Sequence, residues 1–510
     1  MKRKLMSLLL CAATVMGSVA LLASCADNEA SKTTGPNTDI EKPAGEHFLE
    51  KLPDGLNFAN EEFDYDDPLI LYVAYTEGAN GLFTQRSLKA EEEDESPVDQ
   101  KTFERDNRLK TTLGLELEID QIGTGIADME GKIGTSLEAG NPDYDILAGY
   151  QYFGIGMAKR GILLNLANLA QDGADYIDFE APYWGKSYND NMSYKGAYYW
   201  ITGDLALRYI GGMYCTFVNS EIYNTSLQKD YGSIYDIAKK GEWTLDKLYE
   251  MTSKIYEDNG DVVEEPDAAD TFGFGWESTD MIDGIAIGAG VQFTFKNPET
   301  GDVQLTFNNK RTYDISDKLN ALSILPNSFK FDDADSANVM TAFSNGTVAF
   351  TVNKLYQAEA FLDEFENFYI IPAPKFDTTQ TNYITGLHDG CTIFGITSCT
   401  PKVRQAAAAL EFLCAYSSKD VRPVYYEGAL KTTYTRDKEA AEMVDLIHSN
   451  ISTDFALAWG NSINNIGQSF RQCAKISGGS IKREIPKWEE SIKKLGESLI
   501  KHKDGGVEAE

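Results

Sequence analysis

The sequence is poor in basic residues relative to acidic ones. Its 510 residues include 46 lysines and arginines against 79 aspartates and glutamates, which gives a formal net charge of −33 at pH 7. Proteins that bind nucleic acid without sequence preference neutralise phosphates with clustered Lys and Arg, so this composition excludes that class. It also argues against binding to anionic membranes through the protein surface. Neutral or cationic small molecules remain possible ligands.

Cysteine and histidine are also scarce, at 7 and 4 residues. No CxxC or HExxH motif occurs, so we expect no metal site and no cofactor. A phosphate-binding loop and a GxSxG nucleophile motif are missing as well. Cys391 and Cys399 flank an apolar run and Cys414 lies on the face of a predicted helix, which favours buried thiols.

Only one apolar run is long enough to span a membrane, and it lies near the start of the sequence. It extends from Leu5 to Ala23, follows Lys2-Arg3-Lys4 and leads into Ser24-Cys25. This arrangement is typical of a secretory signal peptide. The ending also resembles the lipobox of bacterial lipoproteins, in which the cysteine is diacylated. We expect cleavage after residue 24 and lipidation of Cys25; the alternative is an uncleaved transmembrane anchor.

The remaining sequence predicts a linker followed by an α/β fold. Residues 25–65 follow neither helical nor strand periodicity, so we expect a lipidated N-terminus and a flexible tether. Apolar runs at 69–75, 115–119 and 144–150 predict strands separated by helix-length segments, which indicates a largely parallel sheet. Alternation at 291–295 and 303–307 predicts a hairpin.

Three helices have clear sequence signals. Thr244 and Thr400 are predicted N-caps, and Pro401 follows the second of them at the expected first helical position. Near the end of the chain an apolar stripe predicts a third helix. The stripe consists of Ile485, Trp488, Ile492, Leu495 and Leu499.

Five segments carry distinctive motifs that follow one another along the chain. They are residues 144–166, ending in Gly161-Ile162-Leu163-Leu164-Asn165-Leu166; Met213 to Asn219; Phe343 to Phe350; Ile371-Pro372-Ala373-Pro374-Lys375; and Gly395-Ile396-Thr397 with the Thr400-Pro401 helix. In this order they resemble segments of the extracellular solute-binding proteins of family 1, the sugar-binding components of bacterial ABC importers.

The resemblance implies a periplasmic-binding-protein fold, in which two α/β lobes are joined by three crossings and enclose the ligand. Transferred by segment, lobe one comprises residues 66–213 plus 354–391. Lobe two comprises 219–349 plus 396–503, and 504–510 is a tail. The crossings are then expected near 213–219, 349–354 and 391–396. The implied partners are a sugar or oligosaccharide and the permease subunits of an ABC transporter, and the implied state is a monomer held at the membrane by its lipid alone.

In an open parallel α/β sheet, ligands bind beyond the C-terminal ends of the strands. Aromatic rings can stack on the C–H face of a pyranose, and carboxylates and amides can accept its hydroxyl hydrogens. We expect Trp276 and Tyr152 to stack on the ligand and Asp204 to accept hydrogen bonds. The full set of predicted ligand-binding residues is Glu77, Tyr150, Gln151, Tyr152, Asp204, Trp276, Glu277, Tyr383 and Asp389.

The predicted function is therefore an extracytoplasmic receptor that delivers a solute, most simply a carbohydrate, to an ABC permease by hinge closure, without catalysis. One alternative is an exported enzyme that acts on glycans, because two carboxylates in a cleft are the apparatus of a glycosidase. In so acidic a chain, carboxylate pairs arise often by chance. The other alternative is a receptor for a sensor kinase, which would use the same fold.

Overall fold

The computed structural model describes residues 68–74, 88–90, 96–120, 131, 133–260, 266–276, 280–331, 336–361, 365–430, 438–475 and 484–502. The predicted signal peptide, Cys25 and the linker lie outside these ranges. Within the described ranges, no helix combines the length and the apolar character needed to cross a bilayer.

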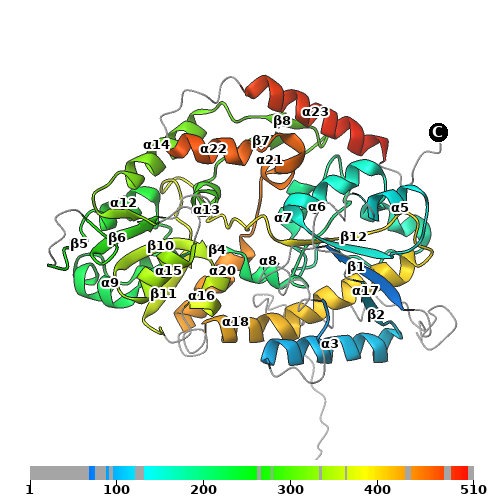
Figure 1. Ribbon diagram of the computed structural model, residues 1–510, viewed down its shortest axis with the longest axis horizontal. Helices are drawn as coiled ribbons and strands as arrows, with labels where there is room; N and C mark the ends of the chain where they lie inside the picture. Colours follow the sequence, from blue (N-terminus) through cyan, green and yellow to red (C-terminus); the bar gives the residue numbers. More distant parts are fainter. Residues whose placement is uncertain are drawn as a thin grey trace, which may run out of the picture. The chain divides into compact units, whose positions relative to one another are not determined.

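Lobe one is built on a four-stranded sheet with the strand order β12-β3-β1-β2 (Figure 1). Its strands are β1 (Leu69–Ala74), β2 (Leu117–Asp120), β3 (Ile146–Tyr150) and β12 (Thr392–Ile396). β1 pairs in parallel with β2 and β3, whereas β12 is antiparallel to β3. The three strands predicted from apolar runs near 69, 117 and 146 are confirmed. They form a mainly parallel sheet, as expected for α/β units.

Lobe two is built on a six-stranded sheet in which β11, β4, β10, β6 and β5 follow one another and β9 also pairs with β6. Its strands are β4 (Tyr214–Asn219), β5 (Tyr256–Glu257), β6 (Thr271–Trp276), β9 (Ser328–Lys330), β10 (Val348–Lys354) and β11 (Phe368–Pro372). Every residue of β4 and β10 is buried. Strands buried on both faces are largely apolar, and the sequences of β4 and β10 agree with this.

Helices cover both sheets and account for most of the remaining described residues. In lobe one and its surroundings they are α3 (Pro97–Leu113), α5 (Gly134–Glu138), α6 (Gln151–Gly154), η2 (Ile155–Arg160), η3 (Leu166–Asp172), α7 (Lys186–Met192), α8 (Leu207–Gly211), α17 (Val403–Tyr416), η4 (Ser417–Val421) and α18 (Arg422–Leu430). In lobe two they are α9 (Ser220–Ser226), α10 (Gln228–Tyr231), α11 (Ile234–Lys239), α12 (Leu245–Thr252), α13 (Asp280–Gly288), α14 (Lys310–Ser323), α15 (Ser336–Ser344), α16 (Tyr356–Phe361) and α20 (Lys438–Ser449).

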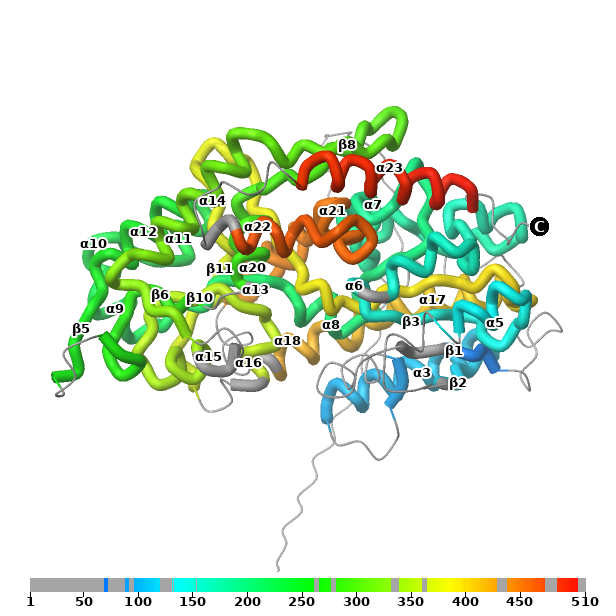
Figure 2. Tube along the Cα trace, turned by 45° about the horizontal axis from the view of Figure 1, so that its top comes forward, coloured from blue at the N-terminus to red at the C-terminus, as the bar shows by residue number. Residues whose placement is uncertain are grey.

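The end of the chain forms a separate group of helices that contacts both lobes. It consists of α21 (Phe455–Ala458), η5 (Gly460–Ile463), α22 (Ile466–Lys475) and α23 (Ile485–Lys501). α21 packs on α7, α22 on α13 and α14, and α23 on η2. Figure 2 shows α22 and α23 running along the same side of both lobes. The predicted apolar stripe of α23 is confirmed, with Trp488, Ile492, Leu495 and Leu499 buried.

Local sequence signals for the helices and the hairpin agree with the structure to within a few residues. The Thr244 side chain accepts a hydrogen bond from the backbone N–H of Lys247 and caps α12, as predicted. The predicted hairpin is formed by β7 (Thr294–Lys296) and β8 (Val303–Leu305). α17 begins at Val403, later than expected, because the Thr400 hydroxyl bonds to Asp145 and to the N–H of Lys402.

Three of the segments that connect the lobes lie side by side and share backbone hydrogen bonds. Tyr214 N–H donates to Gly386 O at 2.9 Å, and His388 N–H donates to Gly212 O at 3.0 Å. The third segment joins on the other side, where Ser452 N–H donates to Thr385 O at 2.9 Å. Short, mutually bonded connections of this kind can absorb a change of dihedral angles while each lobe moves as a body.

The strand pairing corrects the predicted lobe boundaries. β11 pairs with β4 and therefore belongs to lobe two, although 354–391 was assigned to lobe one. β12 pairs with β3, and the following α17 packs on β12 and α3, so both belong to lobe one, although 396–503 was assigned to lobe two. The physical reason is that an interior strand and a crossing strand have the same apolar pattern, and only the pairing partner distinguishes them.

The thiols behave largely as the sequence predicts. Cys215, Cys391 and Cys414 are free and buried, whereas Cys399 is free but partly exposed. Burial raises the pKa of the Cys391 thiol to about 12, so the group stays protonated and packs as a small apolar side chain.

Candidate functional site

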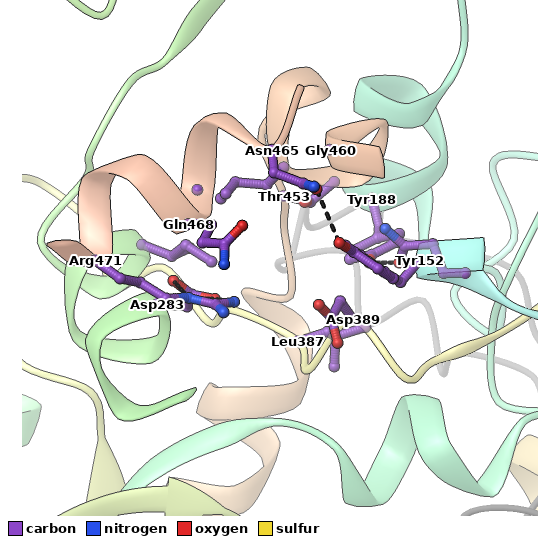
Figure 3. Close-up of a pocket in the computed structure, with 14 residues that line it drawn as sticks. Tyr152, Tyr188, Asp283, Leu387, Asp389, Thr453, Gly460, Asn465, Gln468 and Arg471 are labelled. Carbon is purple, nitrogen blue, oxygen red and sulfur yellow. Dashed lines mark hydrogen bonds and ion pairs between the residues drawn. The ribbon is translucent and has the colours of Figure 1, made fainter. Parts of the chain in front are cut away.

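A pocket lies between the two lobes, beside the connecting segments (Figure 3). Its walls come from α6 and α7 of lobe one, from α13 of lobe two, from the connecting segments and from the helices at the end of the chain. The lining residues are Gln151, Tyr152, Tyr188, Asp283, Ile287, Leu387, Asp389, Thr453, Leu457, Gly460, Asn465, Gly467, Gln468 and Arg471. A ligand held there would contact both lobes.

The lobe-one wall is positioned by the turn at the end of β3. The chain passes directly from Tyr150 into α6, where the backbone N–H groups of Gln151 and Tyr152 donate to Cys391 O at 3.0 Å and Asp389 O at 3.1 Å. The Gln151 amide donates to Ala458 O at 3.2 Å. These bonds fix α6 against the connecting segment and against α21.

Tyr188 completes this wall from α7. Its hydroxyl donates to the Gln151 side-chain oxygen, and its ring is almost fully buried. Burial raises the pKa of Tyr188 well above its ordinary value, and the nearby Cys391 and Asp389 raise it further. The phenol therefore remains a neutral hydrogen-bond donor at physiological pH.

Tyr152 extends from α6 toward a turn in the group of helices at the end of the chain. Its hydroxyl donates to Asn465 Oδ1 at 2.9 Å (Figure 3). Asn464 and Asn465 both have left-handed backbone conformations, with φ of 64° and 50°. Asparagine tolerates this region better than most residues, so the turn between η5 and α22 can direct the Asn465 side chain at Tyr152.

The opposite wall contains an ion pair between two helices. Arg471 on α22 donates through Nε to both oxygens of Asp283 on α13, at 2.9 and 3.0 Å, and a terminal nitrogen of Arg471 makes a further bond to Asp283. Burial acts to lower the pKa of Arg471, but the charges of Asp283 and, more weakly, Asp389 outweigh it and raise the pKa. The guanidinium is therefore charged and oriented by Asp283.

Asp389 lies on the connecting segment just before β12. Its side chain is 34 % exposed. Figure 3 shows the carboxylate between Tyr152 on one side and the Asp283–Arg471 pair on the other. Tyr150 donates a long hydrogen bond of 3.4 Å to its Oδ1. The pocket thus combines phenol rings, two carboxylates, one guanidinium and the amides of Asn465 and Gln468.

The sequence of this chain matches a known protein family. The family model described as bacterial extracellular solute-binding protein matches residues 103–413, which is more than half of the chain. The chain belongs to this family. No curated protein sequence matches it.

Solved structures of low sequence identity share the fold of this solute-binding protein. The sugar-binding protein MalE from Xanthomonas citri matches with a TM-score of 0.53 and 10 % identity, over 85 % of this chain and 98 % of the other. A cyclo/maltodextrin-binding protein complexed with maltotetraose matches with a TM-score of 0.51 and 10 % identity, over 87 % and 98 %.

A third match is the galacto-N-biose/lacto-N-biose I-binding protein of the ABC transporter from Bifidobacterium longum, with a TM-score of 0.50 and 11 % identity, over 86 % of this chain and 98 % of the other. At such identities the likeness establishes the fold alone. It confirms the predicted two-lobe α/β fold of periplasmic binding proteins.

The structure of this solute-binding protein brings together four of the predicted ligand-binding residues. Gln151, Tyr152 and Asp389 line the pocket, and the Tyr150 hydroxyl donates a hydrogen bond to Asp389. Glu77 and Glu277 lie outside the described residues. The other three, Asp204, Trp276 and Tyr383, are in the interior and do not line this pocket.

Asp204 is held inside the protein by Arg422 and His448. Its carboxylate is fully buried and lies 2.6 Å from Arg422 and 2.8 Å from Nε2 of His448. Burial acts to raise the pKa of Asp204, but the charges of Arg422 and His448 lower it below its ordinary value. The expected contact with a ligand is thus replaced by an ion pair that joins lobe one to α18 and α20.

The two interior aromatics are packed by their neighbours. Trp276 is 1 % exposed and lies 5.5 Å from the ring of Phe274. Tyr383 is also buried, and its hydroxyl donates to Ala238 O at 2.9 Å. A position at a strand end determines where the backbone leads, but the face on which the side chain lies depends on the elements packed around it.

Sequence reasoning missed the helical residues of the pocket, namely Tyr188, Asp283, Gln468 and Arg471. They come from α7, α13 and α22, which do not follow strand ends in the predicted pattern. Asp283 and Arg471 are far apart along the chain, and no motif marks either of them. The turn formed by Asn464 and Asn465 was the one local signal, because consecutive asparagines favour special backbone conformations. Among the described residues, no group of three His, Cys, Asp or Glu side chains could hold a metal ion.

Proposed function

We propose that this solute-binding protein is an extracytoplasmic carbohydrate receptor that delivers its ligand to an ABC transporter permease. One observation carries the proposal: in the pocket between the lobes, the ring of Tyr152 lies near the amides of the helices at the end of the chain and near the carboxylates of α13 and of a connecting segment. The family membership supports the receptor role, and the pocket chemistry supports the ligand class.

The lining suits a polyhydroxylated ligand because it offers both a ring and many hydrogen-bonding groups. A phenol ring can stack on the apolar face of a sugar. The amides of Asn465 and Gln468 can donate and accept, and the carboxylate of Asp389 accepts from hydroxyl groups. Solved structures of the same fold include proteins complexed with maltotetraose and with lacto-N-biose, which agrees with this ligand class.

Closure about the connecting segments would couple binding to delivery. The pocket has one wall on α6 and α7 and another on α13, so a ligand that contacts both walls stabilises the approach of the lobes. Such a ligand shifts the population toward the closed form only if it binds that form better than the open one. The hydrogen-bonded segments around Gly212, Gly386 and Ser452 are the proposed hinge.

We propose no catalytic step for this pocket. A glycosidase needs one carboxylic acid that is protonated near neutral pH and a second carboxylate opposite it. Asp283 is bound to the guanidinium of Arg471 by several hydrogen bonds, which favour its charged form and hinder a role as general acid. The pocket therefore favours the receptor over the alternative of a glycan-acting enzyme.

The decisive experiment is a binding screen with the purified protein. Thermal-shift and calorimetric measurements against mono- and oligosaccharides, amino acids, peptides and polyamines identify the ligand class. A ligand at 100 times its dissociation constant should stabilise the protein by about 2.7 kcal/mol. Stabilisation by peptides or polyamines without stabilisation by any sugar would contradict the proposal. Small-angle scattering with and without the bound sugar tests closure, which should lower the radius of gyration.

We also propose that lipid on Cys25 holds the receptor at the outer face of the cell membrane. The support is the sequence Leu22-Ala23-Ser24-Cys25 after a basic start and an apolar run. Two or more acyl chains anchor a protein far more firmly than one, since each buried CH₂ contributes about 0.8 kcal/mol. The Cys25→Ala variant should fail to incorporate labelled palmitate, and undiminished labelling would refute the anchor.

A further inference from the structure

The charged groups of the pocket do not balance. Among the described residues, the lining contains three charged side chains: Asp283, Asp389 and Arg471. Two carboxylates therefore face one guanidinium, so the pocket wall carries a net negative charge. What this excess does to a ligand depends on which carboxylate the guanidinium neutralises.

Arg471 forms its ion pair with Asp283. Its Nε lies 2.9 and 3.0 Å from the two oxygens of Asp283, and a terminal nitrogen bonds to the same carboxylate. Such a multiply bonded pair is geometrically specific and strong. Asp389 is near enough to raise the pKa of Arg471, but no hydrogen bond joins these two side chains in the described structure.

The other neighbours of Asp389 do not neutralise it. Tyr150 contributes a hydroxyl at 3.4 Å. His388 Nδ1 lies 3.8 Å from Asp389 Oδ1, but the same nitrogen accepts a hydrogen bond of 3.0 Å from the backbone N–H of Gly390. In this geometry Nδ1 serves as the acceptor for Gly390 and does not donate to Asp389. Among the residues that the structure describes, no lysine or arginine lies within ion-pair distance of Asp389.

We propose that Asp389 makes this pocket select sugars by charge, so that neutral and amino sugars bind and acidic sugars are rejected. The inference rests on the proposed carbohydrate-receptor function. A carboxylate or sulfate on the ligand would face the Asp389 carboxylate in a partly desolvated cleft, where like charges repel more strongly than in water. A protonated amine would instead gain an ion pair there. The overall charge of −33 adds a long-range field of the same sign.

The test is calorimetry with three matched sets of oligosaccharides: neutral galacto- and gluco-oligosaccharides, oligogalacturonates, and glucosamine oligomers. The parent protein should bind its best neutral or amino sugar at least about tenfold more tightly than the corresponding acidic sugar. In Asp389→Asn this ratio should shrink to within about threefold. Asp175→Asn, which removes the same charge from an exposed position in lobe one, is the matched control and should keep the parent ratio.

A second measurement needs no variant and covers the case in which Asp389→Asn folds poorly. Salt screens charge interactions, so raising the ionic strength should weaken the binding of glucosamine oligomers and leave that of neutral sugars nearly unchanged. An acidic sugar as the tightest ligand of the parent protein, an unchanged ratio in Asp389→Asn, or salt-independent binding of an amino sugar would overturn the selection by charge. If no sugar from any set binds, the proposed carbohydrate function fails and this inference fails with it.

Discussion

Asp204 and Asp389 are two carboxylates with similar sequence settings and opposite surroundings. Asp204 is fully buried between Arg422 and His448, whereas the side chain of Asp389 is 34 % exposed and faces the pocket. The first has its charge neutralised by the protein itself, and the second has no dedicated cation among the described residues. The difference shows that a polar residue at a strand end can serve the stability of the fold or the binding of a ligand.

The aromatic residues Trp276 and Tyr152 differ in the same way. Trp276 packs on Phe274 and other apolar neighbours inside lobe two, and its indole Nε1 has no hydrogen-bond partner among the described residues. Tyr152 lines the pocket and bonds to Asn465 across it. Interior groups should therefore control stability and pocket groups should control affinity.

The largest expected effect is on Trp276. Trp276→Ala should lower the free energy of unfolding by about 3–5 kcal/mol, because it leaves a large cavity in the interior of lobe two. Urea denaturation of the unliganded protein measures the loss. Trp276→Phe is the control: it removes no hydrogen bond and should cost much less. A variant Trp276→Ala that is as stable as the parent but binds sugar poorly would place Trp276 in the ligand site instead.

Asp204→Asn should lower the free energy of unfolding by about 3 kcal/mol, because removing the buried carboxylate leaves Arg422 without its counter-charge. The pH dependence has a defined sign. The lowered pKa of Asp204 means that its contribution is present above the unfolded value near 3.9 and is lost as the pH falls through the folded pKa. Acid unfolding curves of parent and variant should therefore converge at low pH. Curves that stay equally separated down to the most acid conditions would contradict this assignment.

Tyr152→Ala should mainly weaken binding. The loss of ring burial and stacking should cost about 1–3 kcal/mol of affinity for the identified sugar, measured by calorimetry. Tyr152→Phe keeps the ring and removes only the hydroxyl bond to Asn465, so it should lie between the parent and the alanine variant. A large drop in the melting temperature of unliganded Tyr152→Ala, with affinity unchanged, would move Tyr152 to the same class as Trp276.

The last prediction concerns Lys296, a half-buried lysine that joins the β7–β8 hairpin to the end of α7. Its Nζ donates to Ser193 O at 2.8 Å and Ser193 Oγ at 2.6 Å. Burial lowers the pKa of Lys296 to about 8, against the opposing charge of Asp190. Between about pH 8 and the ordinary lysine pKa near 10.4, the unfolded chain therefore binds one more proton at this site than the folded protein. The free energy of unfolding should increase as the pH rises through that range.

Comparison with Lys296→Met isolates this contribution from the other titrating groups. The melting temperature of the parent relative to that of the variant should increase from pH 8 to pH 10. The exposed Lys310→Met variant, which removes a lysine that is 87 % exposed, should show no such trend. If the two variants behave alike, Lys296 titrates as a surface lysine and the burial argument is wrong.

The sequence predicted the local elements well because each depends on neighbouring residues. The apolar run near residue 70, the hairpin around 294–305 and the cap at Thr244 need only the periodicity or the turn chemistry of a short segment. The motifs that resemble extracellular solute-binding proteins are also local, and the family match over residues 103–413 confirms the family that they indicated. In the site, Gln151 and Tyr152, which directly follow β3, line the same pocket as Asp389, and their contact with a ligand stays a prediction.

Which segments meet depends on contacts between distant parts of the chain. β11 and β12 have similar buried sequences, yet one pairs with β4 in lobe two and the other with β3 in lobe one. Asp283 and Arg471 form one ion pair although a large part of the chain separates them. Asp204 and Asp389 differ because of what packs around them, not because of what precedes them. The periodicity of a segment indicates which secondary structure it forms. Its pairing partners, its burial and the net charge of a site depend on long-range contacts that no short stretch of sequence contains.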